Sequence, residues 1–327
     1  MRSVCRQAFL PGNNTYGQTT TSLIDANLLT TALLIDSLVR SIQVGSLYAL
    51  MAVGLTLTLA VIKLPNFAHA ELITVGAYTA LVVSLYVAGN PLLVMVSAFL
   101  AAASTAWLAH RIVYRPLARR RSSTYTLILA SFATGLIVRY LLFLLADHYN
   151  LFDKRIAVAQ TIWVQTTWLT LTNIFFWVVP TSIALVLALS LLLRFTPLGR
   201  QMRALADNFT LAKVIGIPVD RVHDLTWLLA GGLAGVAGAL WGIQTFVDPL
   251  VGWLAILSVF AAVVLGGMTS FIGTILGAFV VGFAENTLMQ LLNAWVGLDF
   301  SFKPIIPFVI IIIVLLIRPE GLRMVND

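Results

Sequence analysis

Long apolar stretches, separated by short polar segments, dominate the pattern of the chain. Seven of them are long enough to cross, or nearly cross, about 30 Å of hydrocarbon. They lie near residues 38–61, 70–89, 91–111, 124–146, 172–194, 224–246 and 304–317. Each predicts a membrane helix, because a helix satisfies its own backbone hydrogen bonds in lipid.

The stretch 254–292 has a different pattern, because glycines interrupt it. Gly266, Gly267, Gly273 and Gly277 predict two short helices that meet at a turn. Two readings stay open here: the pair crosses fully, or it enters and returns to the same side. Either way we expect an all-α, polytopic integral membrane protein with about eight or nine transmembrane helices, this short or re-entrant pair included.

Composition agrees with this class. The chain is 60% hydrophobic and 10% charged, with a mean hydropathy of +0.96, far from soluble domains. The net charge of +7 would suit nucleic acid. However, basic residues of membrane proteins usually collect in cytoplasmic loops, so we expect membrane lipid and no nucleic acid as a partner. The single cysteine, Cys5, excludes an intrachain disulfide and a Cys-rich metal site.

Lysine and arginine fall mostly on one side of an alternating topology. That side holds Lys63, Arg111, Arg115, Arg119, Arg120, Arg121, Arg194, Arg200, Arg203, Lys213, Arg221, Arg318 and Arg323. The bias predicts that a polar loop at 195–223 and the C-terminus are cytoplasmic and that the N-terminus is external. Residues 1–31 are polar and lack the features of a signal peptide. We expect a disordered extension there, or a misassigned start codon, ahead of a transmembrane domain over 32–327.

The loop 195–223 carries an amphipathic pattern. Apolar or small residues recur at helical spacing at Met202, Leu205, Phe209, Ala212 and Gly216, with Arg203, Asp207 and Lys213 beside them. The pattern predicts a short helix with an apolar ridge that inserts into a groove of a soluble partner. Alternatively, the helix lies flat on lipid headgroups. The sharp stop at Gly216 and Pro218 favours docking.

Glycines mark one face of the helix that follows. Gly231, Gly235, Gly238 and Gly242 recur at steps of four, three and four, which predicts close helix packing. A smooth face that lines a solute pathway is the alternative.

Polar residues follow Pro65 after the first membrane helix. Asn66, His69 and Glu71 predict either a broken helix that holds a polar solute or a plain cytoplasmic turn with its side chains in water. No Cys or second His lies near His69, so we expect no metal site.

Ionisable residues also occur inside or beside predicted helices. Asp36 and Arg40 have the four-residue spacing of an ion pair, and Arg139 can extend its side chain outward. Glu285 faces a polar pathway, or it bonds Asn286 or a backbone group of a neighbouring helix.

The chain contains no phosphate-binding loop, nucleophile elbow or zinc-protease motif. We therefore expect no enzyme activity, and an active transporter of this kind would depend on a separate ATPase or an ion gradient.

Five segments together carry a family resemblance. They are NFAHAELITVGAY (66–78), RALADNFTLAKVIGIPVDRV (203–222), LLAGGLAGVAGALWG (228–242), VVLGGMTSFIGTILGAFVVGFAE (263–285) and LLIRPEGL (315–322). In this order they resemble the permeases of ABC importers for branched-chain amino acids, and among these the shorter of the two paired permeases, the LivH type. The resemblance covers roughly residues 38–322; Ala70 stands where the family usually has glycine.

The resemblance implies a subunit of a bacterial or archaeal inner membrane that imports leucine, isoleucine and valine. Its implied partners are a second related permease, two cytoplasmic ATP-binding subunits and an extracytoplasmic solute-binding protein. ATP and Mg would be bound by those subunits, and no cofactor by this chain. Residues 203–217 would couple to an ATPase subunit; matching positions are Arg203, Asp207, Asn208 and Gly216.

Other functions stay open. Similar permeases carry urea, short amides and other small organic acids. An ion-driven secondary transporter would use Glu71, Asp36 or Glu285 as a proton relay. A scaffold without transport is the third possibility.

Overall fold

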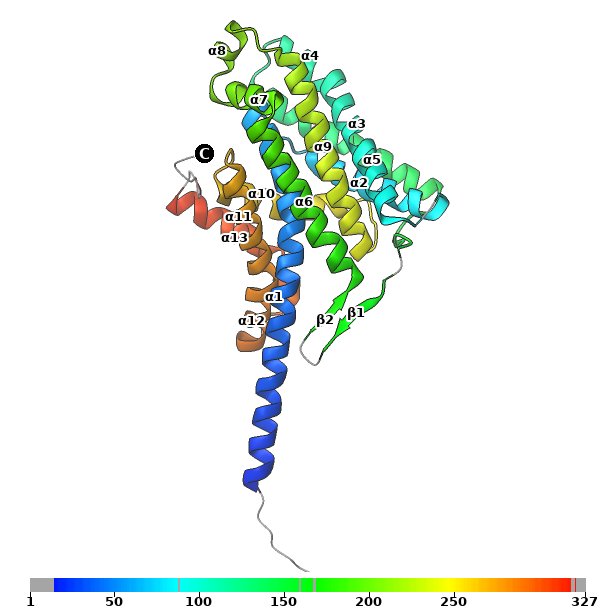
Figure 1. Ribbon diagram of the computed structural model, residues 1–327, viewed down its shortest axis with the longest axis vertical. Coiled ribbons are helices and arrows are strands. Elements are labelled where there is room, and N and C mark those ends of the chain that lie inside the picture. The colour runs from blue at the N-terminus through cyan, green and yellow to red at the C-terminus, as the bar shows by residue number, and fades with distance from the viewer. Residues whose placement is uncertain (1–14, 88, 159, 167–168, 319–320, 322–327) are drawn as a thin grey trace, which may run out of the picture.

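The computed structural model describes residues 15–87, 89–158, 160–166, 169–318 and 321, with side chains from residue 33 onward. Helices form nearly all of the regular structure, which confirms the predicted all-α fold class (Figure 1). The helices of the first half are α1 (Thr15–Ile62), α2 (His69–Tyr86), α3 (Pro91–Ala109), α4 (Arg115–Arg119) and α5 (Thr124–His148). Those of the second half are α6 (Asn173–Phe195), α7 (Pro197–Asp207), α8 (Phe209–Val214), α9 (Val219–Gln244), α10 (Val251–Gly266), α11 (Phe271–Phe283), α12 (Met289–Val296) and α13 (Ile305–Ile317).

Irregular helical turns and one hairpin complete the described part of the chain. Two π-helical turns, η1 (His110–Tyr114) and η2 (Ala284–Leu288), join α3 to α4 and α11 to α12. A 3₁₀ turn, η3 (Phe300–Phe302), precedes α13. The strands β1 (Ile162–Gln165) and β2 (Thr170–Thr172) pair antiparallel before α6, a hairpin that the hydrophobic pattern did not predict.

Seven helices of the described chain are long and apolar enough to cross a membrane. They are Leu33–Ile62, His69–Tyr86, Pro91–Arg119, Thr124–His148, Asn173–Phe195, Val219–Gln244 and Phe271–Val296. Two further apolar helices, α10 and α13, are shorter. The runs near 38–61 to 224–246 match the first six long helices, whereas the run near 304–317 forms the 13-residue α13.

The predicted pair of short helices over 254–292 is only half right. The first, α10, has 16 residues and ends at Gly267, whose φ of 94° is left-handed. Ser270 then begins α11 by accepting a hydrogen bond from the Gly273 amide. The second helix is long, because the π turn η2 keeps the backbone helical from α11 through α12 to Val296.

The predicted N-terminal extension overlaps a helix. Residues 1–14 lie outside the described part of the chain, but α1 begins at Thr15, so the backbone is helical over 15–31, where disorder was expected. This stretch contains no proline and one glycine, and the apolar helix after it supplies a nucleus from which helix can propagate backward. Figure 1 shows α1 projecting beyond the bundle. The division into an extension and a domain over 32–327 stays a prediction.

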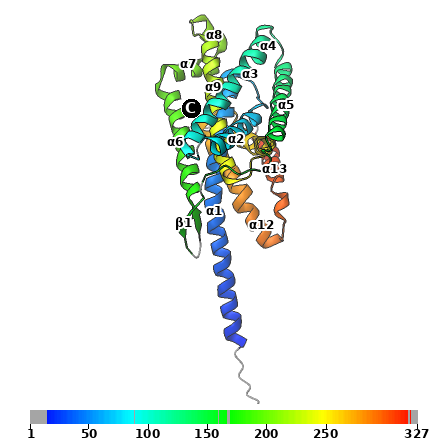
Figure 2. The ribbon, with the colours of Figure 1, turned by 90° about the vertical axis from the view of Figure 1, so that its right-hand side faces the viewer.

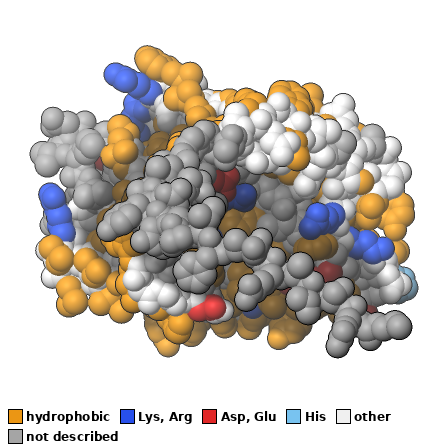
Figure 3. Space-filling view, turned by 90° about the horizontal axis from the view of Figure 1, so that it is seen from below, with side chains coloured by type: hydrophobic (Ala, Val, Ile, Leu, Met, Phe, Trp, Pro, Cys, Tyr) orange, Lys and Arg blue, Asp and Glu red, His pale blue; other side chains and the backbone are white. Residues whose placement is uncertain are grey.

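The core lies where α1, α2 and α9 meet, and α9 packs along both α2 and α3. Most of α5 and α6 is exposed, with apolar side chains outward. Viewed from the end where α1 projects, hydrophobic side chains are spread around the rim of the molecule, as expected for contact with lipid (Figure 3). Turned by 90° about its long axis, the molecule has α4 and α8 at one end and α12 and β1 towards the other (Figure 2).

The glycines of α9 lie against two neighbours. A Cβ at Gly231 or Gly235 would collide with backbone or alanine side chains of α3, and one at Gly238 would collide with the Ile73 carbonyl oxygen of α2. Gly242 faces Ile156 and Val247 instead. The stripe therefore holds α9 between α2 and α3 at backbone distance.

Candidate functional site

The helical backbone is interrupted between α1 and α2, where the sequence allowed two interpretations. We call this interruption the break. Pro65 cannot donate a backbone hydrogen bond, and Lys63 has a left-handed φ of 58°. Asn66 and His69 are both fully buried. The ring of His69 lies with Nε2 3.0 Å from the carbonyl oxygen of Met51. The reading of a turn with its polar side chains in water is therefore wrong, because the structure places them inside the bundle.

Glu71 forms a buried ion pair with Arg139 of α5. Arg139 Nε donates to Glu71 Oε1 at 2.9 Å, and Nη2 donates to the same oxygen. The guanidinium also lies 4.3 Å from the ring centroid of Trp253. Arg139 therefore turns inward to Glu71. The outward orientation that the sequence allowed does not occur. A pair this deep needs both charges, because either one alone would be buried without compensation.

Glu285 lies in η2, away from this cluster. Its carboxylate accepts hydrogen bonds from the hydroxyls of Tyr48, at 2.7 Å, and Ser258, at 2.5 Å. Asn286, the alternative partner, instead donates to the Gly282 carbonyl oxygen. Asn66, His69 and Glu71 are thus all buried at the break but meet different neighbours, namely Tyr114, Met51 and Arg139, and Glu285 lies apart from them. The Asp36–Arg40 ion pair forms as the spacing predicted, at 2.7 Å.

The polar loop contains two helices in place of the single one predicted. Thr196 begins α7 by accepting from the Gly199 amide, and Asn208 ends α7 and begins α8 by accepting from the Leu211 amide. Asn208 has an extended backbone, so the helix breaks there. Gly216 follows α8 with a left-handed φ of 85°. We call residues 197–215, which comprise α7, α8 and Ile215 at the end of α8, the coupling segment, after the role that the family resemblance implies for residues 203–217.

The apolar ridge of the coupling segment mostly faces inward. Met202, Leu205 and Ala212 are buried against the rest of the chain, so the predicted ridge is not free to enter a partner. Phe209 stays 44% exposed. The exposed apolar surface of the segment also includes three residues that were not part of the predicted ridge: Leu211, Val214 and Ile215. Arg203, Asp207 and Asn208 are exposed as well, and Arg203 also donates to the Leu193 carbonyl oxygen at the end of α6.

A cluster of ion pairs fixes the start of α9, and sequence reasoning missed it. Arg111 binds Asp224 through two hydrogen bonds, the shorter of 2.8 Å. Arg119 lies 3.0 Å from Asp220, and Arg115 pairs with the same carboxylate. The two aspartates are four residues apart, and so are successive arginines of the three. This shared helical spacing is the sequence signal from which the ion pairs could have been predicted.

Aromatic rings connect the coupling segment to the interior. Phe209 of α8 stacks on His223 at 6.4 Å between centroids, and His223 lies 6.3 Å from His110 of η1. The next contacts are His110 to Trp227 at 5.7 Å and Trp227 to Tyr114 at 4.7 Å. The rings form a continuous path between α8, α9 and η1.

The path ends at the break between α1 and α2. The hydroxyl of Tyr114 lies 3.4 Å from Asn66 Oδ1, the limit of a hydrogen bond. Since His110 and Tyr114 both belong to the π turn η1, an irregular turn sets the direction of both side chains. A chain of side chains therefore links the coupling segment to Asn66 at the break.

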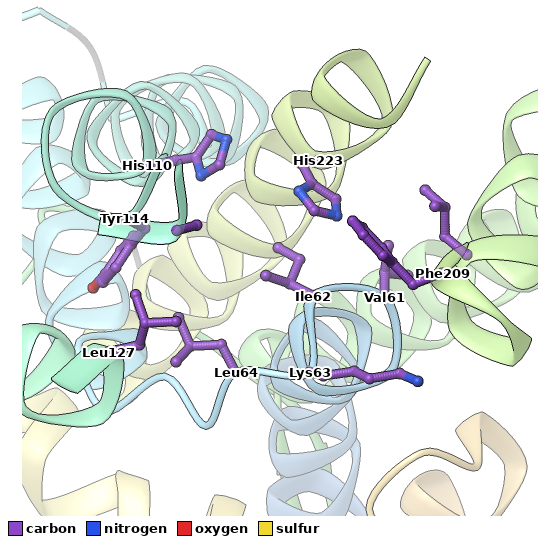
Figure 4. Close-up of a pocket in the computed structure, with 11 residues that line it drawn as sticks. Val61, Ile62, Lys63, Leu64, His110, Tyr114, Leu127, Phe209 and His223 are labelled. Atoms are coloured by element: carbon purple, nitrogen blue, oxygen red, sulfur yellow. The ribbon is translucent and has the colours of Figure 1, made fainter. Parts of the chain in front are cut away.

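A cavity of about 270 Å³ opens beside this path (Figure 4). His110, Tyr114 and His223 contribute to its wall, together with Phe209 and the end of α1. No sequence motif marked it, because its walls come from helices far apart in the chain.

Comparison with known proteins gives consistent matches. Residues 37–315 match the family model described as branched-chain amino acid transport system / permease component. The high-affinity branched-chain amino acid transport system permease protein LivH of Escherichia coli K12 is 30% identical over 308 residues, covering 88% of this chain and 94% of that protein. The probable LivH of Methanocaldococcus jannaschii is 31% identical over 287 residues, covering 86% and 90%. The ribose import permease RbsC of Escherichia coli K12 is 26% identical over 300 residues, covering 86% and 85%.

The helix bundle and these matches together define the class of protein. The chain is a multi-pass membrane permease, the transport subunit of a system with further components. Within that class, the chain belongs to the family of branched-chain amino acid transport system permease components.

Proposed function

We propose that this chain is the permease subunit of an ATP-driven importer for leucine, isoleucine and valine. The observation that carries the proposal is the family match over 37–315, which includes the coupling segment. Relatives from a bacterium and an archaeon that are named for this transport match most of the chain.

The partners follow from the exposed surfaces of the described chain. Leu211, Val214 and Ile215 form an apolar tip on the coupling segment, at the end of the bundle, which suits a groove on a cytoplasmic ATP-binding subunit. The exposed apolar faces of α5 and α6 suit lipid and a second, related permease. A solute-binding protein would deliver the solute at the opposite end.

In this mechanism, closure of two ATP-binding subunits displaces the coupling segment. Phe209 then moves against His223, and the ring path transmits the displacement to Tyr114 and Asn66. The break between α1 and α2 rearranges, and solute passes along the interface between the two permeases. The buried Asn66, His69 and Glu71 act by positioning this break.

Uptake of radiolabelled leucine into proteoliposomes tests the proposal. The vesicles hold this chain with its candidate partners, and the variant Asp207→Arg reverses an exposed charge on the coupling segment. We expect ATP-dependent uptake by the wild type, and assembly without uptake by the variant. Asp147→Arg, the same change at an exposed position at the end of α5, should retain uptake. If no ATP-binding subunit associates with the chain, the proposal fails.

The same assay also tests two other classes of solute and one other source of energy for transport. Excess ribose tests the class named for RbsC, which matches 86% of the chain; urea and acetamide test small amides. An ion-driven transporter would lose uptake when the proton gradient collapses and would need no ATP. Against it, the carboxylates of Glu71 and Glu285 already bond Arg139, Tyr48 and Ser258.

A further inference from the structure

The cavity beside the ring path has the properties of a binding site. Its volume of about 270 Å³ lies just below the roughly 300 Å³ at which sites for drug-sized ligands begin, so it suits a small solute. Much of its wall is aliphatic. Val61 and Ile62 come from the end of α1, Leu64 from the break after it, Leu127 from α5 and Leu205 from α7.

Two polar atoms at this cavity have no partner among the described residues. They are His110 Nδ1 and His223 Nε2, and both are buried. Figure 4 shows the two imidazoles on one side of the cavity, opposite Leu64 and Leu127. Buried polar atoms without hydrogen bonds are unfavourable, and protein atoms cover both nitrogens, so a small turn of either ring toward the cavity would let a ligand pair with it and gain affinity.

The charge around the cavity favours an anionic head group. Lys63 lies on the wall and is exposed, and it has no ion-pair partner in the part of the chain that the structure describes. Asp224, whose carboxylate lies 3.6 Å from His110 Nε2, is also held by Arg111. A small molecule with an aliphatic tail and a carboxylate therefore matches both the walls and the charge.

We propose that this cavity binds a small aliphatic carboxylate from the cytoplasm, the class to which the imported amino acids belong, and that its occupancy slows further import. The regulatory part rests on the proposed function. Leu205 and Phe209 belong to the coupling segment and also contact the cavity. A bound solute would therefore hold the coupling segment against α1 and α9, and accumulated product would restrain the importer.

Photolabelling tests the site directly. The full assembly in lipid nanodiscs is irradiated with a diazirine analogue of leucine, and labelled peptides are located by mass spectrometry. We expect label on the peptide that contains Val61 to Leu64 and on that containing Leu127, displaced by excess leucine and by isocaproate. Label found only at other residues would show that the cavity does not bind the probe. Label at these residues that is displaced by long-chain fatty acid and not by leucine would assign the cavity to lipid. Either result would overturn the proposal.

Filling the cavity tests the regulation. The measured quantity is the ratio of the initial uptake rates into vesicles preloaded with leucine and into empty vesicles. We expect preloading to slow uptake by the wild type at least about threefold, a change of roughly half a factor of ten on a logarithmic scale that initial rates resolve. Leu127→Trp should bring the ratio close to one. Leu129→Trp, two residues along α5 with its side chain exposed, should behave as the wild type.

A second variant tests the binding site independently, in case Leu127→Trp does not fold. His223→Phe keeps a ring beside Phe209 but removes the unpaired nitrogen, and it should weaken displacement by isocaproate about tenfold. An unchanged displacement would refute the role of His223 in binding. If leucine is imported but neither labels the cavity nor alters the ratio, the feedback site is refuted while the proposed function stands. If leucine is not imported and isocaproate still protects the cavity from label, the binding site stands, and the proposed function and the regulation that rests on it are refuted.

Discussion

Among individual side chains, Glu71 and Arg139 form an ion pair that is largely shielded from solvent. Glu71 is 1% exposed, and both contacts from Arg139 fall on one carboxylate oxygen. The other oxygen, Oε2, has no partner among the described residues. The pair is therefore held by charge complementarity more than by a complete set of hydrogen bonds, and loss of either member leaves an unpaired charge.

We expect Arg139→Met to destabilise the chain by about 3–5 kcal/mol, because the Glu71 carboxylate would stay buried without its partner. Adding Glu71→Gln to this variant should recover most of the loss. The measurement is unfolding in mixed micelles of rising SDS content, followed by circular dichroism. Asp36→Asn removes an exposed pair with Arg40 and should cost less than about 1 kcal/mol. Equal losses in the single and double variants would contradict the pairing.

Helix α8 depends on a single side chain for its start. Asn208 Oδ1 accepts from the Leu211 amide at 3.0 Å, and α8 has only six residues, too few to be stable alone. Asn208→Ala should weaken α8 by about 1 kcal/mol and lower uptake. Asn208→Ser, which retains a capping oxygen, should restore both. Hydrogen exchange of residues 209–215 measures the effect, and unchanged exchange in the alanine variant would exclude a capping role.

The contact between α9 and α2 leaves no room for a methyl group at one glycine. A Cβ at Gly238 would overlap the Ile73 carbonyl oxygen, so Gly238→Ala must push two helices apart and should cost about 1–3 kcal/mol. Gly135 of α5 is the matched control, because its nearest neighbours would lie 3.4 Å or more from a new Cβ. Gly135→Ala should be neutral or gain up to about 1 kcal/mol through helix propensity. The thermal unfolding midpoint of Gly238→Ala should therefore fall below that of the wild type, whereas that of Gly135→Ala should stay the same or rise.

The sequence predicted the helices better than it predicted their contacts. Hydropathy depends on local composition, so the runs near 38–61 and 224–246 are visible without the fold. Helical spacing placed Met202 and Leu205 on one face of α7 but could not tell whether that face meets a partner or the chain itself. The pairing of Glu71 with Arg139, 68 residues apart, depends on how whole helices pack, and nothing local encodes it.

For the molecule as a whole, topology is the first property to establish. The coupling segment and α4 lie at one end and β1 and β2 towards the other (Figures 1 and 2). The arginine-rich end would be cytoplasmic by the positive-inside rule.

Single cysteines placed in a Cys5→Ser background test this orientation. We expect Val214→Cys to react with an impermeant maleimide only after the membrane is opened, and Trp163→Cys of β1 to react in intact cells, because both positions are well exposed. Val82→Cys, exposed on a membrane helix, should resist the reagent from both sides. Reaction of Val214→Cys in intact cells would reverse the topology.

The glycine contacts that fix α9 also bear on how this family can be recombined. Because α2 and α9 touch through the backbone at Gly76 and Gly235 as well as at Gly238, neither helix can be exchanged for that of a relative without its counterpart. A chimera that transplants residues 69–109 together with 219–244 should fold, whereas one that transplants either block alone should be degraded. Helix α6 makes no such glycine contact with α2 or α9 and can be grafted from a relative onto an intact central block, whereas a grafted α5 must keep an arginine at position 139 to pair with Glu71 of α2.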